Sequence, residues 1–411
     1  MSSKNLKAPT ELSNRASFTQ KKYFRVLCAL LCALFVGTAW SAPSAQNGIA
    51  TWDPNMAAEN AAMDEAGVKW IDGKDLPIEG RAFDDVEHWY DRLPADVSTN
   101  VNAGVRGMKH HTAGMQFRFQ TDSKTLRFKW TPWNAERLAM GHMASTGVSG
   151  LDIYRQRSDG RWLHVRSFKL PDIVPEDGFA FDIDWKYGGP CLVYLPLYNG
   201  IRSVSLGIDP EAAVEPLPPR ASGVEKPVVF YGTSITQGVC ASRPGMAFVN
   251  IVGRNLDVPV VNLGFAGCGR MEREMSEHLA RIDASCYVLD CLWNMGSADA
   301  DNRPGRNVEE NYEPFLRNLR ARRPGVPIVM AGQCNVRGGA PNAKERFVKA
   351  LHDRLVAEGW RGLVFLPGSG MFADDSEGTV DGVHPNDHGM MSLAKAYGGA
   401  VAEALAIHRD E

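Results

Sequence analysis

From residue 228 onward, the chain alternates short apolar runs with longer segments of helical periodicity. The runs are almost continuously apolar, so both faces of each predicted strand are expected to be buried. Buried strands separated by helices form a parallel sheet that is covered on both sides. The predicted strands are residues 228–231, 258–264, 286–292, 326–330 and 362–366. A first helix is predicted to begin after Pro244, and further helices are predicted over residues 309–322, 342–358 and 387–408.

The preceding part of the chain has a different pattern. Short segments with alternating apolar and polar residues are separated by turn sequences, for example at residues 114–120, 125–130 and 191–195. This spacing is typical of an antiparallel β-sandwich. We therefore expect a jelly-roll-like sandwich over residues 49–208, a stiff proline-rich connector over residues 209–227 and the α/β domain over residues 228–411.

The N-terminus predicts export. Lys21, Lys22 and Arg25 precede the apolar run 26–36, and small residues follow it up to Ala42. This is the pattern of a secretory signal peptide, here residues 1–41, with an uncleaved N-terminal anchor as the alternative. After cleavage we expect a periplasmic or extracellular protein without stable membrane insertion. The formal net charge of −3 gives no basic excess for nucleic-acid binding.

Candidate functional residues follow the predicted parallel strands. Ser234 follows the first strand, Gly267 the second and Asn294 the third, while Asp381 and His384 lie between the last strand and the final helix. Ligands on such sheets bind beyond the carboxyl ends of the strands. All of these loops are therefore expected to open on one edge of the sheet, where they would form an active site.

The residue types fit acyl transfer. A serine hydroxyl needs a base, which His384 can supply, and Asp381 can hold the imidazole and stabilise its charged form. The backbone N–H groups of Ser234 and Gly267, with the side-chain amide of Asn294, can donate to an oxyanion. Three further residues of these loops are weaker candidates for substrate binding: Arg243, Arg270 and Trp293.

These blocks resemble the SGNH (GDSL-type) hydrolase superfamily. Residues 232–234 (Gly-Thr-Ser) stand where the family has Gly-Asp-Ser, and residues 262–267, Asn294 and residues 381–385 resemble its later blocks. Thr233 and the sequence around Asn294 depart from the family pattern. Residues 150–154 (Gly-Leu-Asp-Ile-Tyr) resemble the GxDLY motif of an N-terminal domain attached to certain bacterial members.

The resemblance implies a flavodoxin-like three-layer domain and a carboxylic ester hydrolase that needs no cofactor or metal. Its expected substrate is a small molecule or glycan that carries small acyl esters, above all acetyl groups on a carbohydrate. A lipid or thioester acylhydrolase is the alternative within hydrolases. A glycan-binding protein with a degenerate hydrolase domain is the alternative outside that class.

Other interpretations stay open at this point. An α/β-hydrolase elbow requires Gly-x-Ser-x-Gly, and residue 236 is threonine. Asp381, His384, Asp387 and His388 could bind a metal, although Pro385 argues against one continuous helix face. Cys240 and Cys268 lie in loops at the predicted edge and could form a disulfide or remain thiols. The sequence does not specify an oligomeric state.

Overall fold

The computed structural model describes residues 67–409 except 98, 100, 177, 186, 187, 336, 337, 373 and 374. These residues belong to one unit, Glu59–Glu411. The predicted signal peptide, residues 1–41, lies outside the described residues. In the part of the chain that is described, none of the helices combines the length and the apolar character that a membrane crossing requires.

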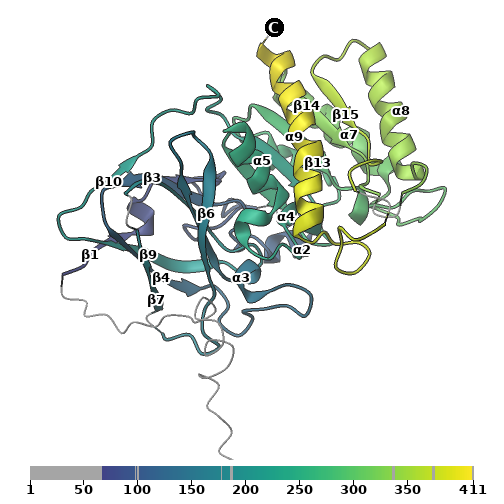
Figure 1. Ribbon diagram of the computed structural model, residues 1–411. Coiled ribbons are helices and arrows are strands. Elements are labelled where there is room, and N and C mark those ends of the chain that lie inside the picture. Colours follow the sequence, from purple (N-terminus) through teal and green to yellow (C-terminus); the bar gives the residue numbers. More distant parts are fainter. Residues whose placement is uncertain are drawn as a thin grey trace, which may run out of the picture. The chain divides into compact units, whose positions relative to one another are not determined.

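The C-terminal half contains a five-stranded parallel sheet (Figure 1). Its strand order is β12-β11-β13-β14-β15, which is the order of flavodoxin-like doubly wound folds. The strands are β11 (Val228–Gly232), β12 (Val260–Gly264), β13 (Cys286–Asp290), β14 (Ile328–Ala331) and β15 (Leu363–Leu366). The predicted fold class is confirmed, because every one of the predicted apolar runs forms a strand of this sheet.

Helices cover both faces of the sheet. Val228 and Phe230 of β11 pack in one core with α5 (Phe248–Leu256) and α9 (Asp387–Arg409). Val229 and Tyr231, which alternate with them, point to the opposite face. The helices on that side are α6 (Arg273–Leu279), α7 (Val308–Arg322) and α8 (Ala343–Ala357). This alternation explains why the strand sequences are apolar throughout.

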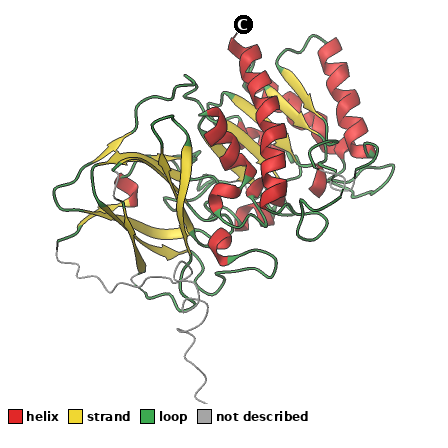
Figure 2. Ribbon diagram, in the orientation of Figure 1, coloured by secondary structure: helices red, strands yellow, loops and turns green. Residues whose placement is uncertain are grey.

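The N-terminal half forms two antiparallel sheets, which Figure 2 shows as a separate group of yellow strands. One sheet has the order β1-β9-β4-β7 and the other β10-β3-β8-β5-β6, with β2 also paired to β3. Their inward side chains share one core. The first sheet comprises β1 (Lys69–Asp72), β9 (Ile201–Ile208), β4 (Thr125–Pro132) and β7 (Phe179–Asp184). The second comprises β10 (Val214–Pro216), β3 (Gln116–Thr121), β8 (Gly189–Tyr194), β5 (Leu151–Gln156), β6 (Trp162–Phe168) and β2 (Ile78–Glu79).

Short helices complete these elements. Within the N-terminal half they are η4 (Gly73–Asp75), α2 (Ala103–Gly107) and α3 (Ser145–Val148). In the C-terminal half they are α4 (Ser234–Gln237), η5 (Pro244–Met246) and η6 (Leu292–Asn294).

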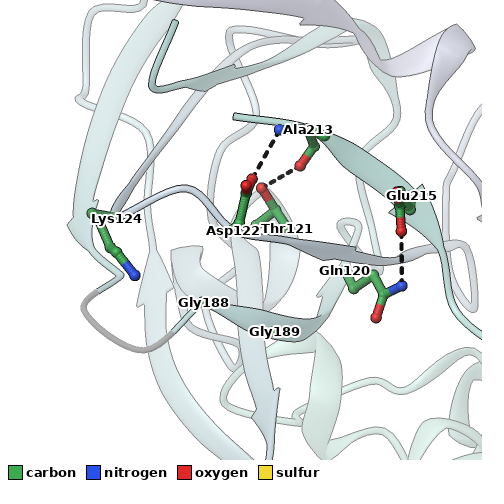
Figure 3. A pocket seen from close by; sticks show the side chains of 8 residues that line it. All are labelled: Gln120, Thr121, Asp122, Lys124, Gly188, Gly189, Ala213 and Glu215. Atoms are coloured by element: carbon green, nitrogen blue, oxygen red, sulfur yellow. Dashed lines mark hydrogen bonds between the residues drawn. The ribbon is translucent and has the colours of Figure 1, made fainter. Parts of the chain in front are cut away.

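Part of the expected connector is a strand. β10 pairs with β3, and side chains next to the pairing reinforce it, as Figure 3 shows. Thr121 Oγ1 donates to Ala213 O at 2.7 Å, and Asp122 Oδ1 accepts from Ala213 N at 2.9 Å. A hollow of about 440 Å³ lies beside these contacts, and Figure 3 shows the side chains that line it. The proline content concealed this strand, but prolines are tolerated on an edge strand.

A segment that precedes β3 packs against the α/β domain. Four of its apolar side chains are buried in the same core as Tyr231 and the helices α6, α7 and α8. They are Phe83, Leu93, Val101 and Val105. The residues assigned to the sandwich from sequence therefore supply part of the core of the parallel-sheet domain. Apolar periodicity does not reveal this packing, because α2 is the only helix or strand among the described residues between β2 and β3.

Candidate active site

Ser234 begins the short helix α4 immediately after β11. Thr233 is the N-cap residue, and its hydroxyl accepts a hydrogen bond from Ile235 N at 3.2 Å. Thr236 Oγ1 reciprocates by accepting from Thr233 N at 3.2 Å. A threonine can cap a helix as an aspartate does, so the departure at position 233 keeps the local geometry that presents Ser234.

Ser234, His384 and Asp381 form a continuous chain of contacts. Ser234 Oγ lies 3.1 Å from His384 Nε2, and His384 Nδ1 lies 2.7 Å from Asp381 Oδ2. The other carboxylate oxygen, Oδ1, accepts from the backbone N–H groups of His384 at 2.8 Å and Val383 at 3.0 Å. Burial opposes the charge of Asp381, but the hydrogen bonds from His384 and Val383 outweigh it and lower the pKa of Asp381 to about 2. Asp381 is therefore an anion that can fix the imidazole orientation.

Two of the expected oxyanion donors are open and the third is engaged. Within the described residues, the backbone N–H groups of Ser234 and Gly267 have no hydrogen-bond acceptor. Gly267 has a φ of +68°, a conformation that favours glycine. The amide of Asn294 instead donates to Gly269 O at 3.1 Å and to Phe265 O at 3.4 Å. Asn294 thus holds the loop that carries Gly267.

The three candidate substrate-binding residues have different surroundings. Arg243 contacts Asp152 and Tyr154 of the sandwich through its guanidinium. Arg270 donates through Nε to the carbonyl oxygen of Gly267 at 2.9 Å and therefore braces the glycine loop. Trp293 is half-buried and lines a hollow of about 360 Å³ that extends to Val383, next to His384. Of the three, Trp293 lines this hollow.

Comparisons with known proteins match both halves of the chain. Residues 225–402 match the GDSL-like lipase/acylhydrolase family, and residues 68–214 match the GxDLY domain described as the N-terminus of SGNH hydrolase-type esterases. The chain is an SGNH-type hydrolase. No curated protein matches it.

Solved structures agree with this assignment. A protein from Bacteroides ovatus ATCC 8483, assigned as a GDSL-like lipase, is 26% identical over 82% of this hydrolase and 98% of its own chain, with a TM-score of 0.70. The salicylyl-acyltransferase SsfX3 from a tetracycline biosynthetic pathway is 16% identical over 83% and 98%, with a TM-score of 0.65. A family two carbohydrate esterase from Cellvibrio japonicus is 12% identical over 83% and 98%, with a TM-score of 0.55. The last two similarities show a shared fold.

Two residues of the hydrolase connect its glycine loop to the sandwich. The Gln237 side chain accepts from Ala266 N at 3.1 Å and donates to His111 Nδ1 at 2.8 Å. Burial and the nearby charge of Arg92 lower the pKa of His111 to about 3, so this imidazole is neutral and can accept the bond. No sequence motif links Gln237 to His111, so nothing in the sequence indicated this contact.

Arg92 is a third residue that sequence reasoning missed. Its buried guanidinium donates to Gly264 O at 2.7 Å and Asn262 O at 3.2 Å, at the end of β12. Burial lowers the pKa of Arg92 to about 9, and among the described residues it forms no ion pair. Its position in the sequence, far from every active-site block, gave no signal of this contact.

The cysteine and metal interpretations find no support in the described residues. Their six cysteines, including Cys240 and Cys268, are free thiols. Burial and the charge of Asp381 raise the pKa of Cys240 to about 12, which disfavours a thiolate nucleophile. No group of three or more metal-ligating side chains occurs in the described ranges. Asp387 is instead hydrogen-bonded to Ser242, and His388 is exposed.

Proposed function

We propose that this chain is an exported serine esterase that removes small acyl groups, above all acetyl groups, from a carbohydrate. The observation that carries the proposal is the Ser234–His384–Asp381 arrangement, with contacts of 3.1 and 2.7 Å. It lies at the carboxyl ends of the strands, where ligands of such sheets bind. Export rests on the predicted signal peptide.

The mechanism uses an acyl-enzyme. Ser234 Oγ attacks the ester carbonyl while His384 Nε2 takes the hydroxyl proton, and Asp381 stabilises the resulting imidazolium. The N–H groups of Ser234 and Gly267 donate to the tetrahedral oxyanion. When the ester C–O bond breaks, His384 returns the proton to the departing sugar oxygen. His384 then activates water, which hydrolyses the acyl-serine and releases the carboxylic acid.

Asn294 has a supporting role in this mechanism. Its amide holds the Gly267 loop through Phe265 O and Gly269 O, so the backbone donors are pre-positioned before the substrate arrives. The Asn294 amide can add a third oxyanion bond only by releasing one of these carbonyl groups.

The hollow beside the catalytic residues supports a small polar substrate. It measures about 360 Å³, and Trp293 and Gln333 contribute to its lining. Within the described residues, Gln333 Oε1 is buried without a hydrogen-bond partner. The carbohydrate esterase from Cellvibrio japonicus shares the fold, so a carbohydrate ester is the substrate class that we propose to test first.

The test uses the chain from residue 42 onward on a panel of acetylated oligosaccharides and on nitrophenyl esters of increasing chain length. We expect acetate release from an acetylated sugar and a preference for the shortest nitrophenyl ester. Ser234→Ala and His384→Ala should each abolish nearly all turnover, and the double variant should be little worse, because both residues act on one proton.

Other outcomes would assign a different function. A preference for long acyl chains would identify a lipid acylhydrolase. Binding of the oligosaccharides without any ester turnover would identify a glycan-binding protein. Circular dichroism of each variant shows whether a loss of turnover reflects the chemistry and not unfolding.

A further inference from the structure

The GxDLY motif directs two side chains out of the sandwich. Asp152 lies on β5 and is buried. Its Oδ2 accepts from Arg243 Nη1 at 2.8 Å and from Gly245 N at 2.7 Å, both in the α/β domain. Its Oδ1 accepts from Ser167 Oγ at 2.8 Å and lies 3.0 Å from His164 Nε2, both on β6. The aspartate of the motif therefore joins the sandwich to residues 243–245.

Tyr154, the last residue of the motif, contacts the same segment. Its hydroxyl accepts a hydrogen bond from Arg243, and the Arg254 guanidinium carbon lies 4.4 Å from the centre of its ring. Gly245 allows this close approach, because a Cβ there would lie 2.4 Å from Tyr154 Oη and 2.6 Å from Asp152 Oδ2. A residue with a side chain at position 245 would therefore collide with Tyr154 and Asp152 of the motif.

The held segment leads to the catalytic histidine. Ser242 donates through its backbone N to Asp387 Oδ1 at 2.8 Å and through Oγ to Asp387 Oδ2 at 2.5 Å. Asp387 begins α9, three residues after His384. On the sandwich side, Thr146 Oγ1 donates to Ser242 O at 2.5 Å. A continuous path of contacts therefore runs from the GxDLY motif to the helix start beside His384.

The ion pair in this path is suited to fixing position. Burial disfavours the charge of Asp152, but the hydrogen bond from His164 and the charge of Arg243 outweigh it and lower the pKa of Asp152. Burial likewise opposes the Arg243 charge, and Asp152 and Tyr154 outweigh it and raise the pKa of Arg243. A largely buried ion pair adds little net stability compared with apolar packing, whereas its bonds fix the geometry of the groups that form it.

We propose that Asp152, Tyr154 and Arg243 form an interdomain latch of positioning residues. The latch holds Ser242, Ser242 holds Asp387, and Asp387 sets the start of α9 so that His384 Nε2 stays within reach of Ser234 Oγ. This inference rests on the proposed serine mechanism. It assigns a function to the GxDLY motif, which contributes no group to the Ser–His–Asp chain itself.

The latch predicts a specific kinetic signature. Asp381 and His384 belong to one loop and contact each other directly, so breaking the latch leaves that pair intact. The rate at the plateau of the pH profile should fall, while the acid limb of that profile stays at the same pH. A displacement of about 1 Å in reacting groups can cost roughly 100-fold in rate.

The experiment compares Ser242→Ala, Arg243→Gln and the double variant with wild type. Ser242 is exposed, so its variant is expected to fold even if a variant of the buried pair does not. Each single variant should lower kcat by about 10- to 100-fold with KM changed less than about twofold. The double variant should be no worse than the worse single variant. Labelling of Ser234 by a fluorophosphonate should slow by the same factor.

Matched controls come from the sandwich. Ser203→Ala removes an exposed serine that bonds Thr131, and Arg127→Gln removes the partner of Asp182 in a partly buried ion pair. Neither pair contacts the path to His384, so both variants should keep wild-type kcat.

Three results would overturn the latch. They are an unchanged kcat in Ser242→Ala, single losses that multiply in the double variant, or an acid limb that moves. A wild type that neither hydrolyses esters nor reacts with the fluorophosphonate would instead overturn the proposed function, and this inference with it.

Discussion

At the residue scale, Asp290 is a buried residue whose carboxyl group contacts α4, the helix that begins with Ser234. It ends β13, and its Oδ2 accepts a hydrogen bond from Thr236 Oγ1 of α4 at 2.7 Å. Burial raises the pKa of Asp290 to about 6, although the hydrogen bonds from Thr236 and Tyr397 oppose this rise. The folded protein therefore binds a proton at Asp290 more tightly than the unfolded chain does.

This shift gives a testable dependence of stability on pH. The contribution of protonated Asp290 is fully present below the unfolded pKa of 3.8 and is lost as the pH rises through about 6. Its size is on the order of 3 kcal/mol at most, from 1.36 kcal/mol per pKa unit. Asp290→Asn keeps an acceptor for Thr236 without a charge. We expect the variant to gain stability relative to wild type as the pH is raised from 4.5 to 8.

Urea unfolding of both proteins across this pH range measures the effect. Asp299→Asn is the control, because Asp299 is exposed and its variant should track wild type at every pH. A constant difference in unfolding free energy between Asp290→Asn and wild type would show that Asp290 does not change its ionisation on folding.

At the element scale, the N-cap of α4 decides how Ser234 is presented. Thr233 Oγ1 satisfies Ile235 N, one of the first N–H groups of a helix that spans only Ser234–Gln237. Thr233→Ala should cost about 1 kcal/mol in stability. It should also lower kcat, because Ser234 is the first residue of the destabilised turn.

Thr233→Ser is the matched variant, since it keeps the hydroxyl and removes only a methyl group. It should retain most of the kcat that Thr233→Ala loses. Steady-state kinetics with nitrophenyl acetate and urea unfolding provide the two measurements. Equal kcat values for the alanine and serine variants would show that the cap does not position Ser234.

The elements differ in how well their sequences predicted them. The buried strands and the long helices α7, α8 and α9 were predicted to within a few residues, because continuous apolar runs and helical periodicity are strong signals. α6 was missed because Arg273–Leu279 is short and rich in charged residues. β9 was missed because its buried and exposed positions do not alternate strictly, and β10 because it contains Pro216.

The same distinction applies to the candidate site. Five candidate residues stand in short motifs that follow predicted strands, so the sequence alone indicated that they would lie close together. They are Ser234, Gly267, Asn294, Asp381 and His384. Arg92, His111 and Gln237 support the site through contacts that join distant parts of the chain. The engagement of Asn294 with Phe265 and Gly269 also depends on loop packing that no motif specifies.

At the scale of the whole molecule, the two halves share structure that neither contains alone. Phe83, Leu93, Val101 and Val105 complete the core on the α6, α7 and α8 side of the parallel sheet. Ala113, Met143, Val148 and Leu197 contribute to the core on the α5 and α9 side. The sandwich half therefore covers apolar surface on both faces of the hydrolase half.

This shared core predicts that the hydrolase half cannot act alone. Residues 225–411 lack these side chains, and they also lack Arg92, which bonds the end of β12, and Asp152, which pairs with Arg243. Losing several buried apolar contacts costs a few kcal/mol for each large side chain, which is comparable to the net stability of a domain.

We therefore expect residues 225–411, produced separately, to be insoluble or to bind a hydrophobic dye with little ester turnover, whereas residues 42–411 should show a cooperative melt and full activity. Adding residues 42–224 in trans should restore part of the turnover if the halves can reassociate through the shared core. Solubility, thermal unfolding and kcat on nitrophenyl acetate decide the matter. A soluble fragment 225–411 with a cooperative melt and the kcat of the longer chain would show that the hydrolase half needs neither the shared core nor the contact with Asp152.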